Sequence, residues 1–498
     1  MSTTSFVYKR VVASVVNAIR TESTAVTKLN NHRTTTTTMS PFTAAGAAAA
    51  TALQKKASLS TQPQEKQHII ILGGGIAGLS TARYLLGRTQ QHQNVKVTLI
   101  DRNSVDDNSS NAPLSSYEQQ RAEFPHLCIP SRRNGNVLCP SLTIPWTTRS
   151  LFNEAFMPAM KSIFSINSNN KQADRPAITF DWKSLMSDRN MYSFATHYVL
   201  QKWICTPPLQ HQSNKSILHY NMKCLDDPSD ALVQSIYYGR YAQGTRLVDG
   251  TVKGEDSSGD IGLFCRGLLS RLKSEYDDRF IVRSGESVEK LLLTKDEQQQ
   301  QHAAAISGVV TVDQNGNKST IHADQFVIAM GNDSRPLCDT IQVPCPIYPV
   351  KGHLVTISSS VDCIYNITLP NGIGYAAPMD HKVNDRRLYR LSGFVDFTPN
   401  KEPDQHRIDA LINAAKVHLD DVELIDASAC HRPFSADDRP IIGPAAKFSN
   451  LYLCTGFGSR GWSIGLGSGS LLASLMLGLP CDIDPEPYLP RRFGTRYF

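Results

Sequence analysis

The chain has 498 residues, which is long enough for two or three domains. It is 41% hydrophobic and 19% charged, an ordinary composition for a folded globular protein. Residues 1–65 hold seven Lys and Arg against two Glu, so most of the formal net charge of +6 lies there and the remainder is near neutral. A near-neutral body without a Lys/Arg-rich run argues against a nucleic-acid-binding protein. The 11 Cys are scattered, with no C-x-x-C and no zinc-type spacing, which favours a reducing compartment and predicts no metal site.

The first 65 residues have the composition of an organelle-targeting segment. They are rich in Ser, Thr and Ala and allow an amphipathic helix over Phe6–Arg20. No uninterrupted apolar stretch follows a basic start, which argues against a secretory signal peptide. We expect a disordered transit segment over 1–65 that directs the protein to the mitochondrion rather than the plastid. A tail without targeting function is the alternative.

The ordered chain is predicted to begin with a β-α-β unit. The apolar run His68–Leu72 predicts a buried parallel strand, and residues 73–78 then read G-x-G-x-x-G. A helix is expected from about Ile76 to Leu86, followed by a second strand over Val95–Asp101. A glycine turn between a strand and a helix, with an acidic residue ending the next strand, is typical of dinucleotide binding.

The glycines of this turn have separate expected roles. Gly73 and Gly75 let the backbone turn tightly and approach a pyrophosphate, and Gly78 lets the helix pack on the strand. Asp101 stands where an acid binds ribose hydroxyls, although it is also simply a charge at the end of a strand. The other predicted contacts near this turn are Ile76, Ala77 and Arg102.

The middle of the chain mixes helical and strand-like patterns. The helical segments are 150–235, 260–275 and 402–419. The strand-like segments are 280–282, 287–293, 326–331 and 348–397, clearest over 350–357 and 387–394. Asn315-Gly316 predicts a hairpin joining 304–312 to 318–322. From these patterns we expect a discontinuous cofactor domain over 66–150, 250–345 and 431–498, and a second domain over 151–249 and 346–430.

A second glycine-rich element lies near the C-terminus. A strand over Leu451–Thr455 leads into a turn with Gly456, Gly458 and Gly461, and an apolar helix begins at about Trp462. Glycines and serines interrupt this apolar stretch, so we predict a buried helix rather than a transmembrane segment. The N-terminus of such a helix stabilises the negative charge of a reduced flavin. A dinucleotide turn at one end of the chain and this turn at the other predict FAD rather than NAD.

Several segments carry a resemblance to a known family. His431–Gly443 resembles the R-P-x-(S/T)-x-D-x-x-P-x-(I/V)-G segment of the D-amino-acid-oxidase superfamily, and Tyr348–His353 resembles its P-V-K-G strand. The glycine loop Gly456–Gly469 is similar to that of the bacterial D-amino-acid dehydrogenase branch. Further similarities to that branch are Ser131-x-x-Asn134-Gly135, Cys139-Pro140-Ser141, Pro145-Trp146 and Glu255–Asp260. The resemblance extends, discontinuously, from about Gln67 to Leu479.

The resemblance implies a Rossmann-like α/β domain that binds FAD, with an α+β substrate domain whose mixed or antiparallel sheet covers the flavin. It also implies oxidation of an amine by hydride transfer from Cα to flavin N5. The cofactor-binding residues expected on these grounds are Gly73, Gly75, Ile76, Ala77, Gly78, Asp101, Arg102, Ser131, Asn134, Gly135, Asn136, Val288, Gly331, Gly456, Gly458, Gly461 and Trp462.

A substrate with a carboxylate calls for a bidentate arginine. By the resemblance, Arg432 is the first candidate, with an arginine that fixes the junction between domains as the alternative. Tyr375 and Arg390 are weaker candidates for the same site. For Lys351 and His353 we expect structural roles, ahead of oxygen activation by the lysine and base catalysis by the histidine.

The most direct hypothesis is an enzyme that oxidises a small amino acid, with a D-amino acid first. The electron acceptor is open among oxygen, a quinone and a carrier protein. Arg460 departs from the dehydrogenase loop, because Gly-Ser-Arg-Gly resembles the oxidase domain that remodels a transfer-RNA wobble uridine. An N-substituted glycine, free or linked to transfer RNA, is therefore a second hypothesis. A flavin-binding assembly factor for a respiratory complex is the third.

Overall fold

A computed structural model describes residues 67–89, 95–103, 135–138, 177–181, 207–254, 256–294 and 304–493. All of them belong to one compact unit, Gln64–Phe498. The predicted transit segment and two predicted cofactor-binding residues, Ser131 and Asn134, lie outside the described residues.

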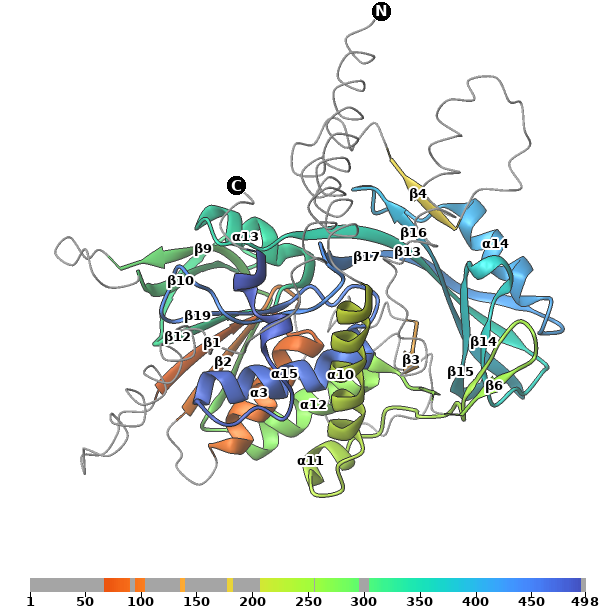
Figure 1. Ribbon diagram of the computed structural model, residues 1–498, viewed down its shortest axis with the longest axis horizontal. Coiled ribbons are helices and arrows are strands. Elements are labelled where there is room, and N and C mark those ends of the chain that lie inside the picture. Colours follow the sequence, from red (N-terminus) through yellow and green to blue (C-terminus); the bar gives the residue numbers. More distant parts are fainter. Residues whose placement is uncertain are drawn as a thin grey trace, which may run out of the picture. The chain divides into compact units, whose positions relative to one another are not determined.

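A six-stranded sheet forms one half of this unit (Figure 1). In spatial order its strands are β18 (Ile441–Pro444), β19 (Leu451–Thr455), β12 (Gln325–Ile328), β1 (Gln67–Leu72), β2 (Val95–Asp101) and β8 (Phe280–Ser284). All neighbours are parallel except β18 and β19. The strands are nearly continuous apolar runs because both faces of the sheet are covered.

The two faces of the sheet belong to different cores. Ile69 and Ile71 of β1 enter one hydrophobic cluster, whereas Ile70 and Leu72 enter another, as the alternation of a strand requires. The helices of the first cluster are α3 (Ile76–Arg88), α10 (Pro207–Leu225), α11 (Ala231–Gln234), α12 (Ile261–Glu275) and α15 (Gly461–Leu477). The second face is covered by the antiparallel strands β9 (Ser287–Leu293), β10 (Ile306–Val312) and β11 (Lys318–His322), with α13 (Ser334–Thr340) and the short helix η7 (Pro490–Phe493). The short helix η4 (Gly331–Asp333) follows β12.

Glycines let α15 lie very close to its neighbouring helices. A Cβ at Gly465 would overlap Ile76 of α3, and one at Gly469 would lie 2.5 Å from the backbone carbon of Ser80. On another side of α15, the Gly467 amide donates to Asn221 Oδ1 of α10 at 3.0 Å. The glycine spacing of this apolar helix is therefore explained by packing against α3 and α10 (Figure 1).

An eight-stranded, mostly antiparallel sheet forms the other half. Its order is β17 (Glu423–Ser435), β13 (Ile347–Ser359), β16 (Arg386–Phe397), β15 (Gly374–Val383), β14 (Asn366–Thr368), β5 (Thr245–Arg246) and β6 (Val252–Lys253), and β4 (Ile178–Phe180) pairs with β16. Helix α14 (Gln405–Ala415) covers one face through a third cluster. A short pair, β3 (Val137–Leu138) with β7 (Ser257–Ser258), forms separately.

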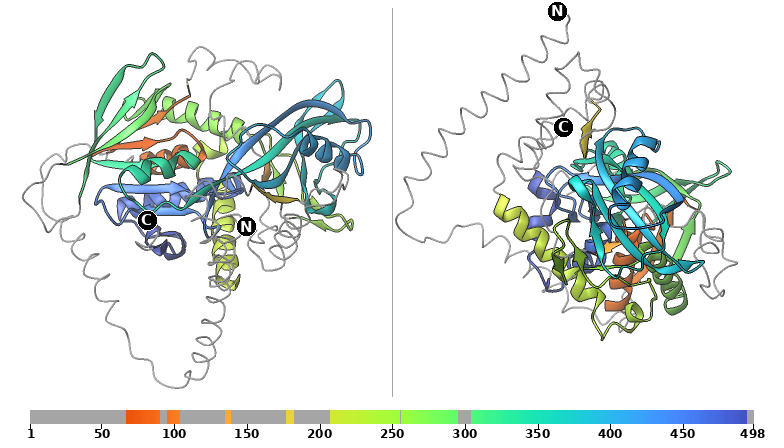
Figure 2. Two further views of the ribbon diagram at one scale, coloured as in Figure 1. Left: turned by 90° about the horizontal axis from the view of Figure 1, so that it is seen from above. Right: turned by 90° about the vertical axis from the view of Figure 1, so that its right-hand side faces the viewer.

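The long strands β13 and β17 join the two halves. Ile347 and Phe434 contribute to the second cluster beneath the six-stranded sheet, whereas Val355 belongs to the third cluster beneath α14. Figure 2 shows the orange strands of one sheet and the blue strands of the other on opposite sides of the left-hand view.

The predicted fold class, a Rossmann-like α/β part with a mixed α+β part, is confirmed. The expected bounds of β2, β9 and β19 agree with the structure. The prediction of mainly helical structure over 150–235 is wrong at Ile178–Phe180, where the chain is a strand because it pairs in parallel with β16. Strand β17 and helix α13 were not predicted.

Candidate cofactor and substrate site

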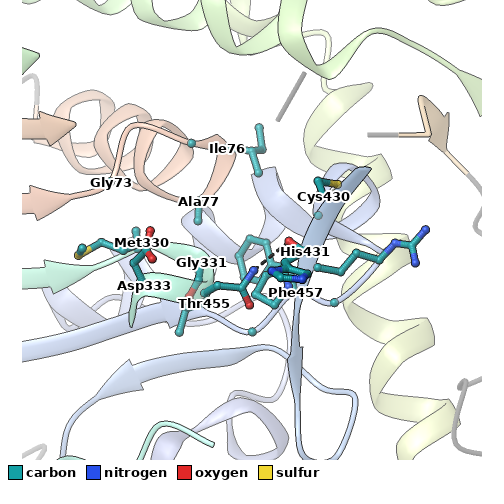
Figure 3. Close-up of a pocket in the computed structure, with 18 of the residues that line it drawn as sticks. Gly73, Ile76, Ala77, Met330, Gly331, Asp333, Cys430, His431, Thr455 and Phe457 are labelled. Atoms are coloured by element: carbon teal, nitrogen blue, oxygen red, sulfur yellow. Dashed lines mark hydrogen bonds between the residues drawn. The ribbon is translucent and has the colours of Figure 1, made fainter. Parts of the chain in front are cut away.

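A cavity of about 790 Å³ opens where β1, β12 and β19 end, between the two sheets, and its volume is within the usual range for ligand sites. Figure 3 shows Ile76 and Ala77 between Met330 and Asp333 on one side and Cys430 and His431 on the other, with Gly73 labelled on the side of Met330. Fourteen predicted residues line it: Gly73, Gly75, Ile76, Ala77, Asp101, Arg102, Gly135, Val288, Gly331, Tyr375, Arg432, Gly456, Gly458 and Gly461.

The first glycine turn presents the N-terminus of α3 to this cavity. Gly73 has a φ of +108°, and a Cβ there would lie 2.5 Å from the carbonyl oxygen of Ala329, so only glycine fits. A Cβ at Gly78 would overlap the Gly73 carbonyl. Gly75 is the N-cap, no side chain caps the helix, and no acidic residue lies in its first turn. Its first amides therefore face the cavity as a site for an anion such as a pyrophosphate.

The Asp101 carboxylate fixes the turn and also lines the cavity. It accepts hydrogen bonds from the Gly74 amide at 2.6 Å and from the backbone and side-chain nitrogens of Asn103 at 2.8 Å. A carboxylate has roughly four lone-pair positions, so about one is left for a ribose hydroxyl. Both roles expected for Asp101 are thus compatible with its geometry.

The acidic residues at the end of the cavity near Val288 are each paired with a cation. Glu286 forms an ion pair with Arg283 at 2.8 Å, Glu289 with Lys318 at 2.7 Å, and Asp333 with Arg102 at 2.9 Å. None of these three carboxylates is therefore left as an uncompensated charge at this end of the cavity.

The second glycine element presents the N-terminus of α15. Gly456 and Gly458 have φ of +74° and +57°, and α15 has neither a capping side chain nor an acidic residue in its first turn. Arg460 forms an ion pair with Asp438 at 2.9 Å, and this carboxylate is almost fully buried. The arginine that departs from the resembling loop therefore fixes the loop.

The residues present fit an FAD. A Cβ at Gly461 would meet no protein atom within 4 Å, so protein packing does not explain the glycine there. Two uncapped helix N-termini, those of α3 and α15, line the same cavity. The α3 turn would hold the pyrophosphate, Asp101 the ribose, and the α15 turn the flavin.

Arg432 lines the cavity and is also fixed to the neighbouring strand. Its Nη1 donates to the Phe394 carbonyl at 2.7 Å, its Nη2 approaches the Gly393 carbonyl at 3.4 Å, and its guanidinium leaves no room for a side chain at Gly352. Burial lowers the pKa of Arg432 from its ordinary value. The guanidinium has five N–H donors, so others remain for a carboxylate. Tyr375 of β15 lines the same part of the cavity.

Four predicted residues lie outside the described cavity lining. Gly78 is in the contact between α3 and β1, and Asn136 is buried with a φ of +59°. The Trp462 ring packs 5.6 Å from Tyr238 in the first cluster, so this residue is a core residue. Arg390 is a buried residue of β16 two positions before Ser392, which does line the cavity.

Lys351 and His353 bind backbone groups outside the cavity lining. Lys351 Nζ donates to the Glu402 carbonyl at 3.0 Å. His353 Nε2 accepts the Asp404 N–H at 3.1 Å, and burial lowers the pKa of His353 to about 4. At neutral pH this imidazole is therefore uncharged.

Some lining residues were not predicted. Among them are Leu354 of β13, Lys401 of the loop after β16, Cys430 and His431 of β17, and Met330 and Asn332 after β12. The carbonyl of His431 accepts a hydrogen bond from Asn332 Nδ2 at 2.9 Å, which joins β17 to η4 (Figure 3). No local sequence signal marks these positions, because the packing of distant strands brings them together.

No helix within the described ranges is both long and apolar enough to cross a membrane.

Comparison with protein families shows a match to the model described as FAD dependent oxidoreductase, over residues 68–116 and 294–475. The D-amino acid dehydrogenase of Bradyrhizobium diazoefficiens is 27% identical over 267 residues, which cover 52% of this chain and 56% of that protein. The enzyme of the same name from Vibrio atlanticus is 27% identical over 258 residues, 50% of this chain and 56% of its own length. The chain thus spans little more than half the length of these curated relatives.

Two solved structures are similar to this chain at low sequence identity. The L-amino acid deaminase from Proteus vulgaris has a TM-score of 0.49 and 19% identity, covering 88% of this chain and 96% of that one. The glycine oxidase from Geobacillus kaustophilus has a TM-score of 0.49 and 16% identity, covering 86% and 99%.

Proposed function

The chain belongs to the family of FAD-dependent oxidoreductases, and on that premise we propose that it oxidises the amine of a small amino acid, with a D-amino acid as the first candidate. The observation that carries this proposal is one cavity lined by the N-termini of α3 and α15 and by Arg432. The relatives described as D-amino acid dehydrogenases support the choice of substrate.

FAD, when bound, supplies the two-electron acceptor for this oxidation. The protein supplies position and charge. Arg432 would bind the substrate carboxylate, and its hydrogen bond to the Phe394 carbonyl holds the guanidinium in place before substrate arrives. The charged lining residues on this side, among those described, are Arg432 and Lys401.

One residue behind the alternative of an RNA-linked substrate has a structural role. Arg460, whose presence suggested that alternative, is paired with Asp438 in the loop before α15. An N-substituted glycine stays in the test panel, because Arg432 would bind its carboxylate equally well.

The test is anaerobic reduction of the bound flavin by D-amino acids, glycine and sarcosine, followed by admission of air. We expect bleaching by at least one D-amino acid, and reoxidation in air would identify oxygen as an acceptor. The Arg432→Ala variant should keep its FAD and require a much higher substrate concentration, with partial recovery in Arg432→Lys. Bleaching by none of these compounds would refute the proposal.

A further inference from the structure

The loop between β16 and α14, residues 398–404, carries Lys401 to the cavity. It contains two local turns, in which the Asn400 N–H donates to Thr398 Oγ1 at 3.2 Å and the Glu402 N–H donates to Asn400 Oδ1 at 2.8 Å. Side chains thus order the loop from within, and Lys401 lies between them, exposed at the edge of the cavity.

Three side chains of β13 and β17 also bind the backbone of this loop. Each binds a main-chain group of the loop: Lys351 Nζ to the Glu402 carbonyl at 3.0 Å, His353 Nε2 to the Asp404 N–H at 3.1 Å, and His431 Nε2 to the Asn400 carbonyl at 3.1 Å. Lys351 and His353 are 5% and 0% exposed. These three hydrogen bonds hold the backbone on both sides of Lys401.

The described acidic residues of the lining come from other elements than Arg432. They are Asp101 of β2, Glu286 just before β9, Glu289 of β9 and Asp333 of η4, and Arg102 pairs with Asp333 among them. On the side of β13, β16 and β17, the charged lining residues of the described chain are Arg432 and Lys401. No described carboxylate forms an ion pair with the Lys401 ammonium. A substrate with one carboxylate would pair with Arg432 and leave Lys401 facing water.

From this arrangement we propose that the substrate is an acidic amino acid, whose α-carboxylate binds Arg432 and whose second carboxylate binds Lys401. The proposal rests on the proposed function and adds a specificity-determining residue. A cation at the edge of the cavity, on a loop whose backbone is held in place, distinguishes an acidic side chain from its amide, which has the same shape and no charge.

The experiment compares D-glutamate with D-glutamine, and D-aspartate with D-asparagine, on the holoenzyme. Two quantities are measured: the Kd from the shift in flavin absorbance, and kcat/KM. We expect the acid to be preferred about tenfold in both, which corresponds to about 1.4 kcal/mol. Added salt should reduce this preference, because it screens a partly exposed pair. Lys401→Gln should abolish the preference, Lys401→Arg should keep it, and Lys401→Glu should reverse it.

Lys416→Gln is the matched control, because Lys416 is an exposed lysine at the end of α14, away from the cavity lining. It should leave the preference unchanged. Equal Kd values for acid and amide, or an acid preference that persists in Lys401→Gln, would overturn the inference. The binding measurement separates the two proposals: if no amino acid reduces the flavin, the proposed function fails, while a tighter Kd for the acid that depends on Lys401 still supports this one.

Discussion

Two glycines of α15 should respond to the same substitution in opposite ways. In Gly469→Ala the new Cβ would lie 2.5 Å from the Ser80 backbone carbon and 2.6 Å from the Thr81 nitrogen. Carbon contacts need 3.5–4.0 Å, so α15 and α3 would have to separate by roughly 1 Å. Such overpacking costs about 3 kcal/mol when backbone must move, against a gain of about 1 kcal/mol in helix propensity. The net loss in the free energy of unfolding should be about 2 kcal/mol.

In Gly461→Ala the Cβ meets no protein atom within 4 Å and lies at the edge of the cavity. The free energy of unfolding of the apoprotein should therefore stay within about 0.5 kcal/mol of the wild-type value, as for a surface substitution. The Kd for FAD should rise at least tenfold, because the methyl group would occupy space reserved for the flavin. Urea unfolding of the apoprotein and quenching of flavin fluorescence measure the two quantities. Wild-type FAD affinity in Gly461→Ala, or equal destabilisation by both changes, would refute this reasoning.

Three further predictions concern buried charges and the N-terminal segment. His353 has a pKa of about 4 in the fold against 6.5 for the free side chain, so unfolded chains bind the proton more tightly. The free energy of unfolding should therefore fall by about 3 kcal/mol as the pH falls from 6.5 to 4. In His353→Gln, whose side chain can still accept the Asp404 N–H, urea unfolding should no longer show this pH dependence. Asp437→Asn should cost about 3–5 kcal/mol because two buried arginines lose their partner, whereas Glu486→Gln, in an exposed pair, should cost under about 1 kcal/mol by the same measurement. Residues 1–65 fused to a fluorescent reporter should direct it to mitochondria; a reporter found in plastids or the cytosol would contradict that proposal.

The elements that could be predicted from the sequence are those with a strong local pattern. The strand, glycine turn and helix at 67–88 are evident because an apolar run stops at glycines and a 3.6-residue period follows. Strand β17 was missed because its sequence, ELIDASACHRPFS, has little hydrophobic periodicity, and it is a strand because β13 pairs with it along its whole length.

The candidate site divides in the same way. Its glycines could be predicted because they belong to turns, but Lys401 belongs to a loop that distant strands bring to the cavity. Arg390 was predicted as a site residue because it is a charged residue on a strand of the substrate domain. It lies two residues, about 7 Å, before Ser392, which lines the cavity. A strand pattern indicates which face a residue is on and does not indicate how far along the strand a cavity extends.

The segment His431–Gly443, which carries the family resemblance, contains buried ion pairs that fix the structure beside the α15 turn. Burial alone raises the pKa of the Asp437 carboxyl, but Arg492 and Arg439 outweigh burial and lower that pKa, so the group is ionised. Arg492 holds both of its oxygens, at 2.8 and 3.1 Å, and so ties the C-terminal turn to this segment.

The neighbouring Asp438 fixes Arg460 at the N-terminus of α15. These pairs determine where α15 begins, and therefore where its first amides point. Within the segment, Arg432 is the arginine that lines the described cavity. Proteins that share such a segment should thus share the placement of a flavin, whereas the choice of substrate should follow residues such as Lys401 that lie in loops outside it.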